Sequence, residues 1–170
     1  THITGSVRAL CAAAQGAAQK LGFQCRMLTD CLDCEAREAG RFLASIARSH
    51  QQTERPLAFF AGGETVVHLT GQGLGGRNQE LALAAAPGLR GTQNTAVCSF
   101  GSDGTDGPTD AAGGFVDQSS DAALRAAGLD VPQVLAENDA YHALQKIGGL
   151  LMTGPTGTNV NDLAMVLIWR

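Results

Sequence analysis

The chain has 170 residues, of which 44% are hydrophobic and 16% are charged, and its formal net charge is −4. This composition excludes a disordered chain, and the acidic balance argues against a general nucleic-acid surface, which needs a basic stripe to displace counterions. The length suits one domain. Only two lysines occur, Lys20 and Lys146, and neither lies in a glycine-rich loop, which excludes a Walker-type phosphate-binding loop.

The first part of the chain predicts a helix, a strand and a second helix. Apolar residues at helical spacing predict a helix over 6–21 that ends near Gly22. The following residues predict a short strand over 23–28, and renewed helical spacing predicts a helix over about 36–47.

The next two apolar segments predict a β-hairpin. Residues 56–61 form a continuous apolar run typical of a buried central strand, and residues 65–69 predict another strand. Only Gly62-Gly63-Glu64 separates the two segments, whereas a parallel pair needs a crossover of about a dozen residues. We therefore expect the two strands to pair as antiparallel neighbours.

Helices and strands alternate through the rest of the chain. A loop over 71–76 leads into an Ala/Leu-rich helix that extends to about Ala86, and Asn138 is expected to cap a later helix. The other predicted elements are strands over 95–100, 150–152 and 163–169 and helices over 122–127 and 140–147. This order predicts an α/β fold, a layered domain whose mixed β-sheet is flanked by helices.

A glycine-rich segment, Gly71-Gln-Gly-Leu-Gly-Gly-Arg-Asn-Gln-Glu80, predicts an anion site. Glycines let the backbone approach a ligand, and the following helix offers free N–H groups and the positive end of its dipole. Arg77 stands at this junction with a fork suited to phosphate or carboxylate. The other phosphate- or substrate-binding residues predicted in this segment are Gly73, Gly75, Gly76 and Asn78. The alternative is a flexible turn followed by a solvated arginine.

The same segment contains the pattern Gly-x-Gly-x-x-Gly at Gly71, Gly73 and Gly76, which is found in nicotinamide dinucleotide sites. In those sites the pattern follows a strand of a βαβ unit, whereas the strand expected here belongs to a hairpin. The dinucleotide interpretation is therefore disfavoured.

An acidic loop follows the strand predicted over 95–100. Asp103, Asp106 and Asp110 could gather around a hard cation such as Mg²⁺, which prefers a few carboxylates together with substrate phosphates. Asp, Gly, Thr and Pro are also ordinary turn formers, so a structural loop is the alternative.

A third loop, over 153–162, is dense in hydroxyl and amide groups. Thr156 and Asn159 are its predicted substrate- or phosphate-binding residues. A long turn without a ligand is the alternative.

The cysteines and the chain start indicate a cytoplasmic protein. Five cysteines without a secretory signal pattern fit reduced thiols, and the apolar stretches fall short of the roughly 18 residues that span a bilayer. Cys31 and Cys34 form a C-x-x-C pair, but without a second cysteine pair or a nearby histidine we interpret them as incidental thiols. A start at Thr1 without an initiator Met indicates a fragment or a processed chain.

Several motifs in the same order resemble the MOFRL domain of bacterial and archaeal glycerate 2-kinases, some of which carry the older label hydroxypyruvate reductase. The motifs are GGETVVHLTGQGLGGRNQELAL, SDGTDGPTDAAG, the helix start Asn138-Asp-Ala-Tyr141, and TGPTGTNVNDL. The resemblance covers residues 55–170, and residues 1–54 resemble a connecting helix–strand–helix segment of the same α/β unit. One departure is Cys34-Glu-Ala-Arg37, where the family usually has glycine at the first position.

This resemblance implies ATP-dependent phosphorylation of D-glycerate at its 2-hydroxyl with Mg²⁺, in a cleft shared with a larger N-terminal Rossmann-like domain that this chain lacks. Arg77 would then be the principal cation that this chain supplies to the phosphate or to the small hydroxy acid. The alternatives are an NAD(P)H-dependent hydroxypyruvate reductase and a non-catalytic binding module. No nucleic-acid or membrane partner is expected, and homo-oligomer formation is left open.

Overall fold

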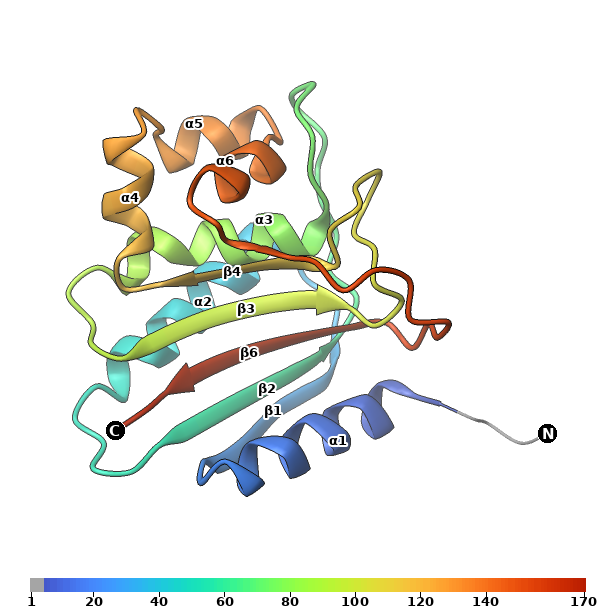
Figure 1. Ribbon diagram of the computed structural model, residues 1–170, viewed down its shortest axis with the longest axis vertical. Coiled ribbons are helices and arrows are strands. Elements are labelled where there is room, and N and C mark those ends of the chain that lie inside the picture. The colour runs from blue at the N-terminus through green and yellow to red at the C-terminus, as the bar shows by residue number, and fades with distance from the viewer. Residues whose placement is uncertain (1–4) are drawn as a thin grey trace.

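A computed structural model describes residues 5–170, and within them one mixed sheet has six strands in the order β1-β2-β6-β3-β4-β5 (Figure 1). Thr1, on which the fragment prediction depends, lies outside the described residues. The strands are β1 (Gln24–Leu32), β2 (Leu57–Gly63), β3 (Thr95–Gly101), β4 (Gly113–Asp117), β5 (Leu150–Leu151) and β6 (Asp162–Ile168). The β1–β2 pair is parallel and the other pairs are antiparallel. The predicted α/β fold with a mixed sheet is confirmed.

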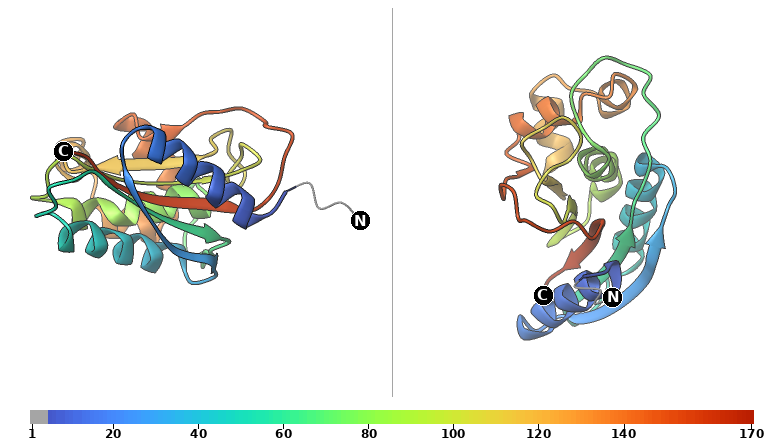
Figure 2. Two further views of the ribbon diagram at one scale, coloured as in Figure 1. Left: turned by 90° about the horizontal axis from the view of Figure 1, so that it is seen from below. Right: turned by 90° about the vertical axis from the view of Figure 1, so that its right-hand side faces the viewer.

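Helices cover both faces of the sheet, as the two views of Figure 2 show. The α-helices are α1 (Val7–Lys20), α2 (Ala36–Ser49), α3 (Arg77–Ala85), α4 (Ser120–Ala126), α5 (Val131–Ala136) and α6 (Ala140–Lys146), and a 3₁₀ turn, η1, spans Ala86–Leu89. Helix α1 packs on β1 and β2, while α2 and α3 pack together on the opposite face. Helices α5 and α6 pack beside α3, which places α3 at the centre of this layer.

The central elements follow from their apolar sequences. Every residue of β2 is buried, because β1 and β6 flank it, α1 packs on one face, and Leu57, Phe59 and Ala61 share an apolar core with α2. Residues 78–85 of α3 are also all buried. Helix α1 begins at Ser6, whose hydroxyl accepts a hydrogen bond from Ala9 N–H and so caps the helix.

The predicted hairpin strand over 65–69 is wrong. In this segment only Val66 forms a β-bridge, a parallel one with Glu35. Strand β2 already pairs with β1 on one side and β6 on the other, so it has no free edge for an adjacent segment. Residues 64–76 instead form an extended strap that leads into α3.

Other differences concern local signals that tertiary contacts override. Asn138 does not cap α6; Asp139 is the N-cap residue and makes no side-chain cap bond. Strand β4 was not predicted, because it begins with Gly113 and Gly114, which give no apolar alternation. Helix α5 was not predicted either, since it has six residues and Pro132 near its start.

The ends of the three central strands bring distant parts of the chain together. The last residues of β2 and β3, Gly63 and Gly101, both pair with Asp162, the first residue of β6. The strap and the acidic loop therefore begin, and the loop before β6 ends, at the same end of these strands, on the right of Figure 1. No helix within residues 5–170 is long and apolar enough to cross a membrane.

Candidate functional site

An open cleft of ≈ 580 Å³ lies between the strap and the beginning of α3. The strap and the acidic loop follow the carboxyl ends of β2 and β3, where ligands commonly bind in α/β folds. Its lining residues are Glu64, Thr65, Val66, Val67, Leu69, Gly71, Gly73, Gly75, Gly76, Arg77, Glu80, Gly107, Pro108, Asn138 and Ala140. The predicted residues Gly73, Gly75, Gly76 and Arg77 therefore lie in one cavity.

Arg77, the first residue of α3, is held by two carboxylates. Its Nε and Nη2 donate to the two oxygens of Asp162, at 2.5 and 3.1 Å. Its Nη1 lies 3.2 Å from Glu64 Oε1. The hydrogen bonds to Asp162 raise the pKa of the Arg77 guanidinium, although burial opposes the shift. Arg77 is thus a fixed cation at the cleft, and its first partners are internal.

Asp106 occupies the anion position at the start of α3. Its carboxylate accepts the backbone N–H groups of Asn78 at 3.2 Å and of Gln79 at 2.9 Å, as well as Asn78 Nδ2. Burial raises the pKa of this carboxyl to about 6, although these hydrogen bonds oppose the shift. A Cβ on Gly76 would lie 2.3 Å from Asp106 Cγ, so this contact requires glycine. First-turn donors of α3, including the predicted ligand Asn78, are therefore taken by an internal carboxylate.

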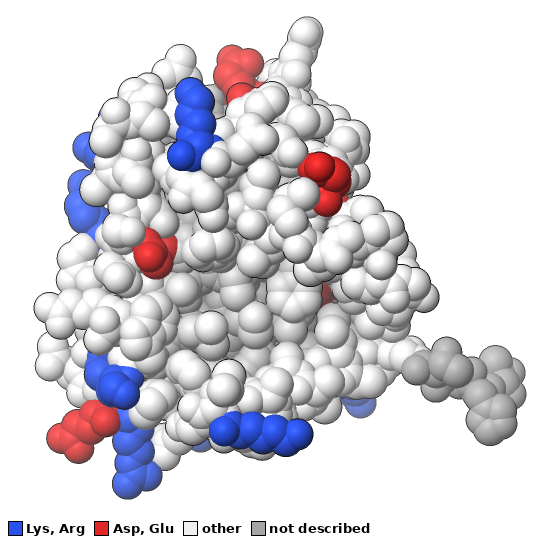
Figure 3. Space-filling model, in the orientation of Figure 1, with Lys and Arg blue, Asp and Glu red and all other residues white. Residues whose placement is uncertain are grey.

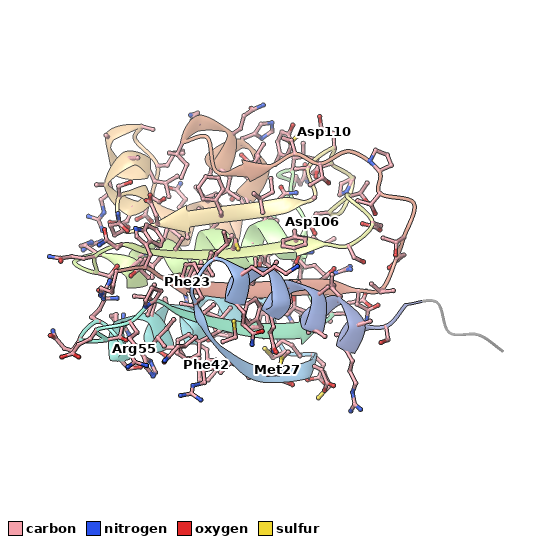
Figure 4. All side chains as sticks on the ribbon, turned by 60° about the horizontal axis from the view of Figure 1, so that its bottom comes forward. Phe23, Met27, Phe42, Arg55, Asp106 and Asp110 are labelled. Atoms are coloured by element: carbon pink, nitrogen blue, oxygen red, sulfur yellow. The ribbon has the colours of Figure 1, made fainter. Side chains whose placement is uncertain are left out.

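The three aspartates of the acidic loop do not form one group. Asp106 is 3% exposed, whereas Asp110 is exposed and accepts a hydrogen bond from Tyr141 Oη at 2.8 Å. Asp103 accepts the backbone N–H of Thr105. In Figure 4, Asp110 lies on the outer part of the loop and Asp106 nearer the sheet. In the part of the chain that the structure describes, no three His, Cys, Asp or Glu side chains could hold a metal together. This set does not fit Mg²⁺.

A buried amide holds the middle of the strap. Asn138 Oδ1 accepts the backbone N–H groups of Thr70 at 2.7 Å and Gly71 at 2.8 Å, and Asn138 Nδ2 donates to Glu80 Oε2 at 3.2 Å. Asn138 adopts a left-handed backbone conformation with φ of 55°. Because this backbone is tied to a side chain of the α5–α6 turn, these strap amides are not available to a ligand.

An ion pair between Arg37 and Glu80, one of the lining residues of the cleft, supports this arrangement. Glu80 is 2% exposed, and its Oε1 lies 3.0 Å from Arg37 Nη2. Burial raises the pKa of Glu80, while the bonds from Asn138 and Arg37 act in the opposite direction. Arg37 and Glu80 are not among the predicted site residues, although both lie within the quoted family motifs. Their long sequence separation from Asn138 hid the network.

The loop before β6 contacts the acidic loop through Thr156, while Asp162, at the end of the segment predicted as this loop, bonds Arg77 directly. Thr156 Oγ1 donates to Ser102 O at 2.5 Å, and Thr156 N–H donates to Asp103 O at 3.1 Å. Thr156 lines a separate cavity of ≈ 310 Å³ beside the start of α1, and Asn159 is exposed. The structure thus brings the three predicted loops to the same end of the central strands but leaves Thr156 and Asn159 outside the Arg77 cleft.

Among the described residues, neither the charged side chains nor the thiols indicate a second functional site. The face in Figure 3 shows no continuous basic patch, and its charged residues lie mostly near the margin. Cys31 and Cys34 are exposed free thiols within the described residues.

Comparisons with known proteins agree with the fold and with the motifs. The MOFRL family model matches residues 57–162. A D-glycerate 2-kinase of Thermotoga maritima is 56% identical, and the match covers 98% of this chain and 41% of that protein. The crystal structure of a glycerate kinase of the same organism has a TM-score of 0.94 over the same shares of the two chains.

Two further relatives are informative. A glycerate 2-kinase of Pyrococcus horikoshii is 45% identical over 93% of this chain and 37% of its own length. A protein of Agrobacterium vitis, with the provisional name hydroxypyruvate reductase, is 39% identical over 98% of this chain and 41% of its own length. The chain thus spans about two fifths of the length of these relatives.

Proposed function

Because this chain belongs to the MOFRL family, we propose that it is part of a D-glycerate 2-kinase and forms one wall of the active site. The observation that carries the proposal is the open cleft beside the end of β2, with Arg77 among its lining residues. The relatives named glycerate 2-kinase, which are longer than this chain, supply the substrate class. A second domain of the same enzyme would form the opposite wall.

In this proposal the reaction transfers the γ-phosphoryl group of ATP to the 2-hydroxyl of D-glycerate. Phosphoryl transfer depends mainly on positioning and on neutralising charge. Arg77 would contact the transferring phosphate or the substrate carboxylate, because it is the cation at the cleft and its fork suits both groups. Gly73, Gly75 and Gly76 stay predictions as substrate contacts, because the space that each gains by lacking a Cβ is filled by neighbouring groups of the protein.

The proposal includes Mg²⁺ only because this ion usually accompanies ATP in phosphoryl transfer. Asp106 is committed to α3, and Asp103 and Asp110 bind neighbouring groups of the protein. We therefore assign no metal-dependent step to this chain. Asn78, Thr156 and Asn159 stay predictions as ligand contacts, as do a cytoplasmic location and a homo-oligomer.

The name of the Agrobacterium vitis relative favours a second candidate, an NAD(P)H-dependent hydroxypyruvate reductase. The arrangement around Gly71 argues against it, since the strap is not a strand of a βαβ unit. Assaying the complete enzyme with glycerate and ATP, and separately with hydroxypyruvate and NADH, distinguishes the two reactions.

Arg77→Ala in the complete enzyme tests the proposal. Removing one charge-stabilising donor costs about 10²–10³-fold in kcat, and we expect a loss in or beyond that range. Arg77→Lys keeps the charge without the fork and should recover only part of the loss. The matched control is Arg55→Ala. Arg55 is an exposed arginine just before β2, at the end of that strand away from the cleft (Figure 4). Near-normal kcat/KM in a folded Arg77→Ala enzyme would contradict the proposal.

A further inference from the structure

The two carboxylates on Arg77 differ in burial and geometry. The Asp162 side chain is 8% exposed and accepts two hydrogen bonds from the guanidinium, from Nε and Nη2. The Glu64 side chain is 54% exposed and makes one contact, with Nη1. A two-bond contact with a buried carboxylate fixes the plane of a guanidinium, whereas one contact with a solvated carboxylate is weak.

The sheet fixes the position of Asp162. As the first residue of β6, Asp162 is paired with Gly63 on one side and Gly101 on the other. Asp162 is absent from the lining of the open cleft and instead borders a small internal cavity of ≈ 10 Å³, together with Thr65 and Asn78. A ligand in the open cleft would therefore meet Arg77 before it could reach Asp162.

Glu64 stands on the opposite side of the guanidinium. Its backbone N–H donates to Leu32 O at 2.7 Å, which fixes the start of the strap. Its side chain lines the open cleft beside Arg77. The carboxylate of Glu64 thus contacts Nη1 of Arg77 within the lining of the open cleft.

We propose that Asp162 is the positioning residue that holds Arg77, and that Glu64 is an exchangeable partner whose place on Nη1 is taken by the anionic group of the substrate. This inference rests on the proposed function, because it assigns the substrate anion to the cleft. In the free protein Glu64 competes with the substrate for Nη1. When the substrate binds, the Glu64 side chain turns into solvent while Asp162 keeps its two bonds.

Kinetics of the complete enzyme test the exchange. Glu64→Gln removes the competing charge, so KM for D-glycerate should fall by up to about fivefold, the size that one exposed ion pair supports, while kcat changes little. Glu54→Gln is the matched control, because it removes an exposed charge just before β2, at the opposite end of that strand. An unchanged or higher KM in Glu64→Gln overturns the exchange. A fall in kcat of a hundredfold or more also overturns it, since Glu64 would then act on the reacting atoms.

The positioning role is tested by a measurement that needs no turnover. In the ¹⁵N-labelled 170-residue chain, the Arg77 Nε–H signal, assigned by its absence in Arg77→Lys, should exchange slowly with water in the wild type and in Glu64→Gln. Asp162→Asn should make the exchange fast, and should lower kcat of the complete enzyme about 10²-fold, the cost of a misplaced reacting group. Slow exchange that persists in Asp162→Asn overturns the positioning role, as does fast exchange in Glu64→Gln.

Arg77→Ala in the same assays separates this inference from the proposed function. If Arg77→Ala is inactive and Glu64→Gln leaves KM unchanged, only the exchange fails. If Arg77→Ala retains activity, the proposed role of Arg77 fails, and the Nε–H measurement alone decides whether Asp162 positions it.

Discussion

The glycine-rich end of the strap, 71–76, and the loop before β6, 153–161, look alike in the sequence but use glycine for different reasons. In the strap, a Cβ on Gly71 or Gly73 would lie within 2.6 Å of the backbone of Glu137. In the loop before β6, Gly154 and Gly157 have positive φ angles of 69° and 75°, and a Cβ there would meet nothing within 4 Å. Close approach requires glycine in the first segment, and a left-handed turn favours it in the second.

Glycine density alone therefore does not identify a ligand site. The strap glycines bring its backbone against the α5–α6 turn and the acidic loop, so they build the wall of the cleft. Gly154 and Gly157, before β6, instead adopt left-handed backbone angles that a turn requires. The strap is therefore expected to be sensitive to substitution and the other loop tolerant.

The largest contrast is expected between Gly76→Ala and Gly157→Ala. A Cβ at position 76 would expel the Asp106 carboxylate from the start of α3 and leave its buried donors without a partner. We expect a loss of about 4 kcal/mol in the free energy of unfolding. Gly157→Ala should cost about 1 kcal/mol, the usual penalty of a left-handed alanine. Urea unfolding of the two variants decides, and equal losses would erase the distinction between the two segments.

A second contrast uses asparagines. Asn138→Ala removes the partner of the backbone N–H groups of Thr70 and Gly71 and one hydrogen bond to Glu80 Oε2, and should cost about 3 kcal/mol. Asn159→Ala changes an exposed side chain and should stay within about 0.5 kcal/mol. Chemical unfolding monitored by circular dichroism measures both. A small effect of Asn138→Ala would mean that the strap is held by its other contacts.

The pH dependence of stability sharpens the role of Asp106. Its pKa rises from 3.8 to about 6 on folding, so between these values the folded state binds the proton more tightly than the unfolded chain. The stability contributed by Asp106 is therefore highest below pH 3.8 and falls as the pH rises to about 6, by on the order of 2–3 kcal/mol. The difference between wild type and Asp106→Asn, measured by urea unfolding from pH 3.5 to 7, should show this fall. Asp103→Asn in the same loop is the control, and a pH-independent difference would contradict the shift.

The smallest effect is expected for the exposed cysteines. Cys31→Ser together with Cys34→Ser should change the free energy of unfolding by less than about 0.5 kcal/mol and leave the activity of the complete enzyme nearly intact. Cys98→Ser places a hydroxyl in the buried middle of β3 and provides the contrast. Thermal unfolding and steady-state rates measure both, and a large loss in the double variant would indicate a role for the thiol pair.

Elements that are encoded by a continuous run of neighbouring residues could be predicted from the sequence. The apolar run of β2 and the Ala/Leu-rich α3 are long enough to specify buried elements, and the alternation of helices and strands specifies an α/β fold. The same local reading placed Arg77 at a helix start. It also produced the one wrong strand, over 65–69, because a short apolar segment does not reveal that β2 already has two neighbours.

Only the tertiary structure decided which groups surround Arg77. Asp162 lies 85 residues from Arg77 in the sequence, and Asp106 caps α3 from 28 residues away. Asn138 lies 67 residues from Gly71, whose backbone it holds. A carboxylate or an amide carries the same local signal whether it binds a ligand, a metal or another part of the protein. The pairing of β6 between β2 and β3 places Asp162 and the acidic loop beside the start of the strap, so that these carboxylates become internal partners of Arg77 and α3.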